Sequence, residues 1–410
     1  MNDFNFLGSN TSLVKAHNLR AILLTLLHEE HVSRVELAKR TSLSTTTITN
    51  LVDELLAQGI VAEEQGDAPT LPRQVGRPRT ALRLVLNARY AVGVHIGIGI
   101  LRVGVTNLNA ELAYNSFADF DIQSPADDIL KLIAVEVEKA IHASGIDRSM
   151  IIGVGIGASG LTSYRNGVTT IAPRLGWHNV PVRDRLQELL NLPCVVDNNV
   201  RCMAVGEAFF GLGRGVNTLI FVYGRAGIGA GIVVDRMVYR GSAGGAGEIG
   251  HTIMDPEGDL CRCGRRGCLE TLISEPVLVR EAQKIAQAYP ASLIAQYFNQ
   301  PGEDRPIERV FAAARAGDPL VQRMIEKRTR YLGTSLAYLV NLFDPDLILL
   351  GGVFAQGQDV LLPIAEATMR ELAFGGLGEK VRLQPTGFGW RAGVIGAAAL
   401  ALTSLFYFES

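Results

Sequence analysis

Three cysteines within eight residues constrain this chain more than any other feature of its sequence. Cys261, Cys263 and Cys268 lie in the run Cys-Arg-Cys-Gly-Arg-Arg-Gly-Cys, and His251 lies ten residues before the first of them. Three thiols and one imidazole are the ligand set of a closed tetrahedral zinc site, which keeps no position open for a substrate. We therefore expect a structural Zn²⁺ and a loop that folds back around it. The alternative is a trio of reduced cysteines without a metal.

Length and composition indicate a folded protein with more than one domain. The 410 residues are too many for one compact core, and 48% hydrophobic with 20% charged residues argues against extensive disorder. Five cysteines, and an N-terminus without an export signal, predict a reducing compartment, the cytoplasm. Cys194 and Cys202 lie in apolar surroundings and are expected in the core. The apolar runs 21–27 and 392–402 are too short to span a bilayer, so no membrane partner is expected.

Residues 1–86 predict a winged helix-turn-helix. Apolar residues at helical spacing predict an amphipathic helix that ends near His28, and Ser33 with Glu36 forms a capping-box pattern for a second helix. Ser44 is the expected cap of a third helix over residues 45–58. The exposed start of this third helix carries short hydroxyl and amide side chains, at Thr45, Thr46, Thr47 and Asn50. Such side chains can hydrogen-bond to phosphates and base edges of double-stranded DNA.

A basic segment follows, between strands expected at 60–62 and 81–86. No acidic residue occurs between Asp67 and Glu111, whereas six arginines do: Arg73, Arg77, Arg79, Arg83, Arg89 and Arg102. Arg77 and Arg79, in a Gly-Arg-Pro-Arg context, are expected to enter a minor groove. The segment favours DNA binding over the alternative, a three-helix structural or protein-docking module.

From Tyr90 onward, strands and helices alternate, which predicts an α/β fold with two lobes and a ligand cleft between them. Strands are expected at 91–98, 101–107, 112–120, 151–156, 194–196, 217–223, 231–234 and 347–350. Helices are expected at 125–143, 186–190, 199–210, 320–342 and 392–402.

The run Gly247-Glu-Ile-Gly-His251, followed by Cys-x-Cys-Gly-x-x-Gly-Cys-Leu-Glu, resembles the signature of the ROK family of repressors, open reading frames and sugar kinases. The resemblance covers about residues 87–410. The preceding segment is similar to the helix-turn-helix of the xylose-repressor-like branch. The resemblance implies an actin-like ATPase (ribonuclease H-like) fold. We expect a DNA-binding domain at 1–86, a first lobe at 87–198 plus 392–410, and a second lobe at 199–391.

The resemblance also implies a sugar site. By position, Glu248, His251 and Glu270 contact sugar hydroxyls, and His251 is a zinc ligand as well. Carboxylates suit this role because they accept hydrogen bonds from adjacent hydroxyls. Asn198, Asn199 and Arg174 complete the expected sugar-binding set. The alternative is that the two glutamates only support the metal ligands.

We expect the kinase chemistry of the family to be lost. Asn199 occupies the position of the family's catalytic aspartate, and an amide cannot take a proton at neutral pH. The first phosphate loop reads His95-Ile-Gly-Ile-Gly, and the second reads Arg225-Ala-Gly-Ile-Gly, where the family has Asp-x-Gly-Gly-Thr and Gly-Thr-Gly-x-Gly. Arg174 and Arg201 also replace asparagines. They either favour an anionic sugar or pair with a carboxylate such as Asp197, and we prefer the pairing.

Together these features predict a sugar-responsive transcriptional regulator, a repressor of carbohydrate genes and not an enzyme. A sugar or sugar derivative in the cleft is expected to control binding to a double-stranded DNA operator allosterically. The protein is expected to be a homo-oligomer, either a dimer or a dimer of dimers. The enzyme alternative is an ATP-dependent, glucokinase-like sugar kinase with an added DNA-binding domain. A third hypothesis is a DNA-binding scaffold that ignores ligands.

Overall fold

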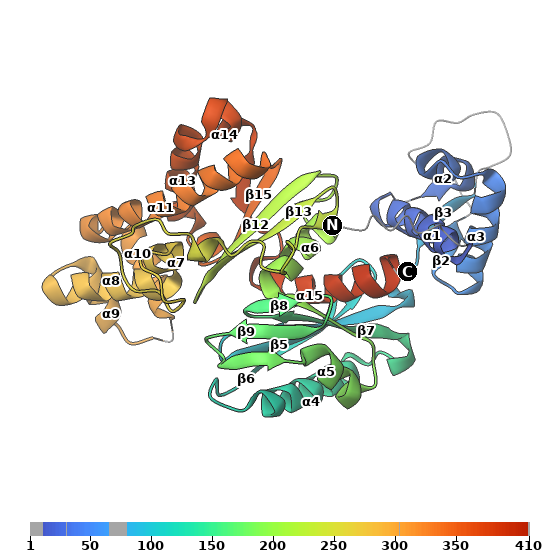
Figure 1. Cartoon of the computed structure of the whole chain (residues 1–410), viewed down its shortest axis with the longest axis horizontal. Helices are drawn as coiled ribbons and strands as arrows, with labels where there is room; N and C mark the ends of the chain where they lie inside the picture. Colours follow the sequence, from blue (N-terminus) through green and yellow to red (C-terminus); the bar gives the residue numbers. More distant parts are fainter. Residues whose placement is uncertain (1–10, 30, 65–79, 303, 409–410) are drawn as a thin grey trace, which may run out of the picture.

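The computed structural model describes residues 11–29, 31–64, 80–302 and 304–408. Figure 1 shows a small N-terminal domain at one end of an elongated molecule, two β-sheets in the middle, and a group of helices around α8 and α9 at the other end. The C-terminal helix α15 points its far end toward the N-terminal domain.

The N-terminal domain is a winged helix-turn-helix, as predicted. Three helices pack on a sheet of order β1-β3-β2, and their bounds are α1 (Thr11–His28), β1 (Val32–Ser33), α2 (Arg34–Thr41), α3 (Thr45–Ala57), β2 (Val61–Glu64) and β3 (Ala81–Leu84). The capping box is confirmed, because the Ser33 side chain accepts from the Glu36 amide and the Glu36 carboxylate accepts from the Ser33 amide at 2.9 Å. Ser44 Oγ accepts from the Thr47 amide at 3.1 Å and begins α3. Most of the basic segment between the two strands, with Arg73, Arg77 and Arg79, lies outside the described residues.

Two five-stranded sheets with the same connectivity form the rest of the core. In each, three consecutive antiparallel strands are extended by two parallel ones, in the orders β6-β5-β4-β7-β11 and β14-β13-β12-β15-β16. The first sheet comprises β4 (Tyr90–Ile96), β5 (Ile100–Asn107), β6 (Leu112–Asp119), β7 (Ile151–Ala158) and β11 (Cys194–Asn198). The second comprises β12 (Thr218–Gly224), β13 (Ile228–Val234), β14 (Met237–Val238), β15 (Leu347–Gly352) and β16 (Arg382–Pro385). This repeated unit confirms the expected two-lobed, actin-like architecture.

Helices α6 (Asn199–Phe210) and α15 (Ala392–Leu402) lie against each other between the two sheets. Glycine allows α15 to approach the first sheet closely, because a Cβ on Gly155 would lie 1.9 Å from the carbonyl oxygen of Ala397. The run 392–402 was expected to be too short to span a bilayer. The helical stretch that contains it covers residues 389–407, which is long and apolar enough to cross a membrane. However, 67% of its most apolar window is buried, so it serves as a core helix.

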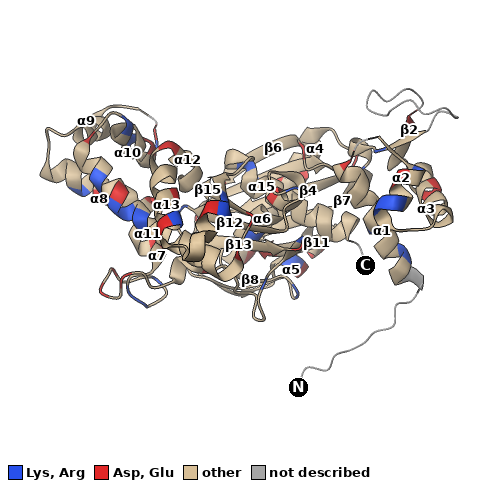
Figure 2. Cartoon of the chain, turned by 90° about the horizontal axis from the view of Figure 1, so that it is seen from above, with Lys and Arg blue, Asp and Glu red and all other residues tan. Residues whose placement is uncertain are grey.

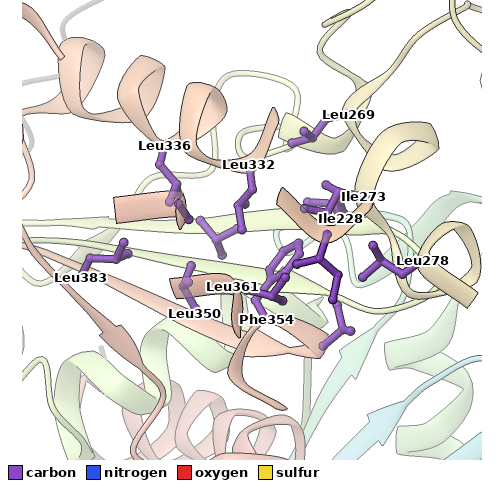
Figure 3. Packing of buried hydrophobic residues seen from close by; sticks show 14 of the residues in the cluster. Ile228, Leu269, Ile273, Leu278, Leu332, Leu336, Leu350, Phe354, Leu361 and Leu383 are labelled. Atoms are coloured by element: carbon purple, nitrogen blue, oxygen red, sulfur yellow. The ribbon is translucent and has the colours of Figure 1, made fainter. Parts of the chain in front are cut away.

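The outer faces of both sheets are covered by the remaining helices. Figure 3 shows Leu332 and Leu336 of α11 beside Leu350 and Leu383 of the second sheet. The helices on this lobe are α7 (Leu269–Ile273), α8 (Glu275–Ala288), α9 (Leu293–Asn299), α10 (Pro306–Arg315), α11 (Pro319–Phe343), α12 (Val353–Gln356), α13 (Gln358–Leu372) and α14 (Leu377–Lys380). The first sheet is covered by α4 (Ala126–Ser144) and α5 (Val182–Leu190).

Most predicted elements are present with shifted ends. Strand β2 begins at Val61 rather than at residue 60, and α5 begins four residues before the expected 186. Helices α7 to α10 and α12 to α14 and strands β14 and β16 were not predicted, and neither was a small sheet of β8 (Leu161–Ser163), β9 (Val168–Ala172) and β10 (Trp177–Val180). Its strands are too short for alternation to be recognised in the sequence.

The end of the chain joins the N-terminal domain to the core. After α15 the helix continues as a π-helical segment, Thr403–Tyr407. The Arg20 guanidinium of α1 lies 3.8 Å from the centroid of the Phe408 ring, and Phe408 contacts Phe209 of α6 edge to face, with 5.3 Å between centroids. The Tyr407 hydroxyl donates to the Leu108 carbonyl at 2.7 Å. Helices α1, α6 and α15 therefore meet at one aromatic joint.

Candidate functional site

A cavity of about 370 Å³ lies between the two lobes, where β4, β7, β11 and β12 end. Ligands of α/β proteins commonly bind at the carboxyl ends of parallel strands, since polar loop residues converge there. All six residues predicted to bind sugar line this cavity: Arg174, Asn198, Asn199, Glu248, His251 and Glu270. The structure thus brings together residues that are up to 96 positions apart in the sequence.

Two carboxylates form one part of the cavity wall. Glu248 precedes the short 3-10 turn Ile249–His251 and stays accessible from the cleft, although burial by the surrounding walls raises the pKa of its carboxyl. Glu270 is in the first turn of α7, and its Oε1 lies 3.2 Å from Cys261 Sγ. A Cβ on Gly227 would lie 3.1 Å from Glu270 Oε2, so this glycine leaves room beside the carboxylate. Glu270 therefore lies next to both the cavity and the cysteine cluster.

The two asparagines at the start of α6 differ in their availability. Asn198 Oδ1 accepts from the amides of Val200 and Arg201, and its Nδ2 donates to the Gly160 carbonyl at 2.9 Å. Its main visible task is therefore to cap α6. The Nδ2 of Asn199 donates to Ser159 Oγ at 3.3 Å, while its Oδ1 has no hydrogen bond among the described residues. Asn199 thus keeps an acceptor for a ligand hydroxyl.

The two arginines considered for an anionic sugar have separate roles. Arg201 is 1% exposed and pairs with Asp197 at 2.7 Å, which confirms the preferred salt bridge. Arg240 also pairs with Asp197, at 2.8 Å, and Asp197 is fully buried. Arg174 does not join this network. It lines the cavity and donates to the Ala226 carbonyl at 2.5 Å.

The four predicted metal ligands come together in space. The ligand atoms of His251, Cys261, Cys263 and Cys268 all lie within 4.8 Å of one another. The distance from Cys261 Sγ to His251 Nδ1 is 3.6 Å, and that from Cys263 Sγ to Cys268 Sγ is also 3.6 Å. A tetrahedral zinc site with Zn–S bonds of about 2.3 Å has edges of about 3.8 Å, so donor types and spacing fit a four-coordinate metal.

The predicted DNA-binding side chains lie at the start of α3. Thr45, Thr46 and Asn50 are exposed, whereas Thr47 is half-buried and its hydroxyl lies 2.9 Å from Ser44 Oγ. Figure 2 shows acidic residues on α3 and no lysine or arginine. Both acidic residues of α3 are paired, Asp53 with Arg34 and Glu54 with Lys15. The outward start of α3 is therefore polar and uncharged.

The basic segment is less available to DNA than its composition indicated. Arg83 pairs with Glu64 at 2.5 Å, and Arg89 donates to the Ala88 carbonyl at 2.7 Å. Arg102 lies on β5 in register with His95, far along the chain from the wing. Arg102 is therefore not part of the wing, although it lies in the same basic stretch of the sequence. Charge counting along a sequence does not show where each side chain points.

Comparison with known proteins agrees with this geometry. The ROK family model matches residues 91–404, and a model of winged helix-turn-helix DNA-binding domains matches residues 16–62. The chain belongs to the ROK family. We therefore call residues 91–404 the ROK domain.

Similar proteins include both regulators and kinases. This ROK protein is 28% identical over 399 residues to the xylose repressor of Caldicellulosiruptor bescii, covering 97% of this chain and 98% of that one. It is 31% identical over 315 residues to the glucokinase of Streptomyces coelicolor, covering 76% and 96%. A solved ROK family transcriptional regulator, a homolog of the E. coli MLC protein, has a TM-score of 0.83 at 29% identity, covering 96% and 97%. A ROK glucokinase from Streptomyces griseus, solved with glucose and AMPPNP, has a TM-score of 0.68 at 30% identity, covering 77% and 100%.

Ser159 and Glu275 are polar residues of the cavity wall that the sequence did not point to. Ser159 follows strand β7 and anchors Asn199, and its own hydroxyl donates to the Ile96 carbonyl at 2.9 Å. Glu275 begins α8 and lies 3.9 Å from the guanidinium of Arg225. Ser159 was recognisable as a polar residue directly after a buried strand, whereas Glu275 gave no comparable signal.

Proposed function

We propose that this ROK protein is a sugar-responsive transcriptional regulator that represses genes of carbohydrate metabolism. The observation that carries the proposal is the pairing, within one chain, of a winged helix-turn-helix with a ROK domain, over the full length of known repressors. The kinases that match cover only the ROK domain. Regulation of DNA binding by a sugar is the function that uses both the DNA-binding domain and the ROK domain.

In this proposal the cleft holds a sugar through its hydroxyls. Glu248 and Glu270 accept hydrogen bonds from adjacent hydroxyls, and Asn199 Oδ1 supplies a further acceptor. His251 uses Nδ1 toward the cysteines, which leaves Nε2 for the ligand. Arg174 and Asn198 also line the cavity, and we assign them to the same ligand.

We assign the cysteine cluster to a structural Zn²⁺. Bound zinc would hold the loop 251–268 together and fix the orientation of the His251 ring beside the sugar. The ligand set is complete with four protein atoms, so the metal takes no part in chemistry on the ligand. The contact between Glu270 and Cys261 links the metal site to the sugar site.

We further propose that the cleft does not phosphorylate its ligand. Asn199 occupies the place of a base and donates to Ser159, and losing a general base costs on the order of 10² to 10⁴ in rate. A screen of sugars with ATP and magnesium tests this. Appreciable phosphorylation that disappears in Asn199→Ala would establish the kinase alternative instead.

Ligand binding reaches DNA through α6 and α15 in this proposal. Both helices begin beside the cleft, at Asn199 and near His95, and both end at the aromatic joint with α1. Allosteric coupling is typically about 1–3 kcal/mol, or about 5- to 150-fold in affinity. We propose a homodimer or dimer of dimers, because helix-turn-helix proteins read paired half-sites.

The test is calorimetry of the full-length protein against a panel of sugars, followed by a mobility-shift assay with operator DNA and the sugar that binds. We expect one sugar to bind and to change operator affinity. If sugars change neither thermal stability nor operator affinity, the protein is a ligand-independent scaffold and the proposal is wrong.

A further inference from the structure

Helix α3 turns one face outward from the molecule. It lies on the side of the N-terminal domain away from the two large sheets (Figure 1, Figure 2). Its buried side chains are Ile48, Leu51, Val52 and Leu55. With about 3.6 residues per turn, Thr46 and Asn50 fall on the opposite side of the helix, one turn apart, and both are exposed. These two positions can therefore meet a DNA duplex.

Most polar side chains around Asn50 already have partners within the helix. Thr49 donates to the Thr45 carbonyl at 2.9 Å, and the Thr47 hydroxyl lies 2.9 Å from Ser44 Oγ. Asn50, by contrast, makes no side-chain hydrogen bond among the residues that the structure describes. Its amide therefore keeps both a donor, Nδ2, and an acceptor, Oδ1, for a partner outside the chain.

The two carboxylates of α3 are held by cations from other helices. Arg34 of α2 pairs with Asp53 at 2.9 Å and with Glu63 of β2 at 2.9 Å. Lys15 of α1 pairs with Glu54 at 2.8 Å. These pairs reduce the repulsion between α3 and DNA phosphates, and they occupy the carboxylates that could accept from cytosine N4. Neither acidic residue is therefore free to read a base.

An amide side chain matches one base edge in the major groove better than the others. Adenine presents N7 as an acceptor beside N6 as a donor, so an asparagine can make two hydrogen bonds with it. Guanine presents two acceptors, and cytosine and thymine present one polar group each, so the same amide makes only one hydrogen bond with them. Guanine is commonly read by arginine or lysine, and the 13 residues of α3 include neither.

The neighbours of Asn50 allow this short side chain to reach the bases. The other residues on the outward side include Thr46, Thr49 and Ala57, which are all small and exposed. The major groove is about 12 Å wide, close to the diameter of an α-helix with its side chains. A long side chain at any of these positions would hold the helix away from the base edges, so small neighbours favour a contact through asparagine.

We infer that Asn50 reads an adenine in the major groove of the operator, through N6 and N7, and is the main base-reading residue of α3. The inference rests on the proposed function and deepens it, because it names a base pair that each half-site contains. The preferred operator therefore has an A·T pair at one fixed position of each half-site, and this position depends on Asn50.

Selection of duplexes from a library of random sequence, with the full-length protein, tests this. We expect the wild type to enrich one A·T pair per half-site, and replacement of this pair to weaken binding about 5- to 150-fold, the range of a bidentate contact. Asn50→Ala should accept all four base pairs at that position about equally and keep its preferences elsewhere. Mobility-shift titrations at one salt concentration measure these affinities.

A modified base distinguishes a direct contact from a change in the helix. 7-Deazaadenine lacks the N7 acceptor but still pairs with thymine. At the selected position it should weaken binding of the wild type about two- to tenfold, and should not weaken binding of Asn50→Ala further. The measurement on the wild type decides alone if thermal unfolding shows that Asn50→Ala is not folded. Asn166→Ala, at an exposed position of the ROK domain, is the matched control and should bind every duplex as the wild type does.

The outcomes distinguish this inference from the proposed function. If the wild type selects an operator but Asn50→Ala relaxes no position, or relaxes a G·C pair, the inference is wrong while the regulator remains. If the wild type binds 7-deazaadenine as tightly as adenine, the contact to N7 is absent and the inference is also wrong. If the wild type prefers no sequence over any other, the proposed function itself fails.

Discussion

A buried network around Asp197 holds one wall of the cleft in place. Asp197 is fully buried and binds two arginines, Arg201 at 2.7 Å and Arg240 at 2.8 Å. Arg201 also donates to the carbonyls of Gly244 and Thr162, both at 2.8 Å. These contacts hold the start of α6 against strand β8 of one lobe and the loop at Gly244 of the other, so this wall of the cleft is fixed.

Asp197→Asn is expected to destabilise the fold strongly. Removing one partner of a buried ion pair typically costs about 3–5 kcal/mol, because the remaining charges stay buried without a counter-ion. Denaturant unfolding measures the loss. Asp184→Asn is the matched control, since Asp184 is 64% exposed and its pair with Arg183 should contribute less than about 1 kcal/mol. Similar losses in the two variants would contradict the structural role of Asp197.

His28 predicts a pH dependence at the contact between domains. Burial, followed by the charges of Arg236 and Arg214, lowers its pKa from 6.5 to about 4. Between these pH values the unfolded chain binds a proton that the folded chain does not, so stability falls as pH drops from 6.5 toward 4. The stability difference between wild type and His28→Gln, measured by urea unfolding, should therefore shift between pH 7 and pH 5. His142→Gln, at an exposed position, should track the wild type at both pH values.

At the scale of elements, helix α3 has one face that packs into its domain and another that is exposed. Ser44 caps its N-terminus, and Ile48, Leu51, Val52 and Leu55 pack it into the domain. Thr46, in the first turn of α3, is exposed, and its side chain makes no hydrogen bond among the described residues. Substitutions at Ser44 and at Thr46 should therefore have different effects, the first on stability and the second on DNA binding.

Ser44→Ala is expected to lower the stability of the protein by about 0.5–2 kcal/mol, since it removes an N-cap. Thr46→Ala should leave stability within about 0.5 kcal/mol and weaken operator binding about two- to tenfold, through loss of a hydrogen bond to DNA. Unfolding curves and mobility-shift titrations measure the two effects. If Thr46→Ala binds operator as tightly as the wild type, the α3 surface is not the DNA-binding face.

At the scale of the whole molecule, the aromatic joint is the place where the ligand cleft meets the DNA-binding domain. Helices α6 and α15 pack closely along their length, and a Cβ on Gly396 would lie 2.5 Å from the Cys202 carbonyl oxygen. Two helices in such close contact move together rather than independently. We therefore propose that a shift at the cleft is transmitted to Phe209 and Phe408, which are in contact, and from Phe408 to Arg20 of α1.

Phe408→Ala is expected to uncouple the two sites. The effector should bind with unchanged affinity, and operator should still bind, but the effect of effector on operator affinity should fall several-fold toward none. Parallel calorimetry and mobility shifts measure this. Phe374→Ala removes a phenylalanine that is 80% exposed on the opposite lobe, and should keep full coupling. A Phe408→Ala protein with undiminished coupling would exclude the joint as the route.

Metal removal is a second test at this scale. Chelation should lower both the unfolding temperature and the affinity for the effector, because Glu270 lies between the cysteine cluster and the cavity. Differential scanning calorimetry and titration, before and after dialysis against a chelator, measure the two quantities. Zinc added back should restore both. Effector binding that survives complete loss of metal would contradict the proposed role.

The sequence by itself determined the features whose partners lie a few residues apart. The caps at Ser33 and Ser44 and the helical period of α3 follow from local contacts, and so does the close spacing of the three cysteines. The family signature added the residues expected to bind sugar, and the structure places them around one cavity.

Only the tertiary structure decided which side chains meet across long distances in the chain. Arg102 lies on β5 of the first sheet and not in the wing. Arg201 forms an ion pair with Asp197, whereas Arg174 lines the cavity. The sequence around an arginine does not determine its partner, because the long side chain can reach several carboxylates or carbonyls with similar energy. The packing of strands and helices from different parts of the chain selects one of them.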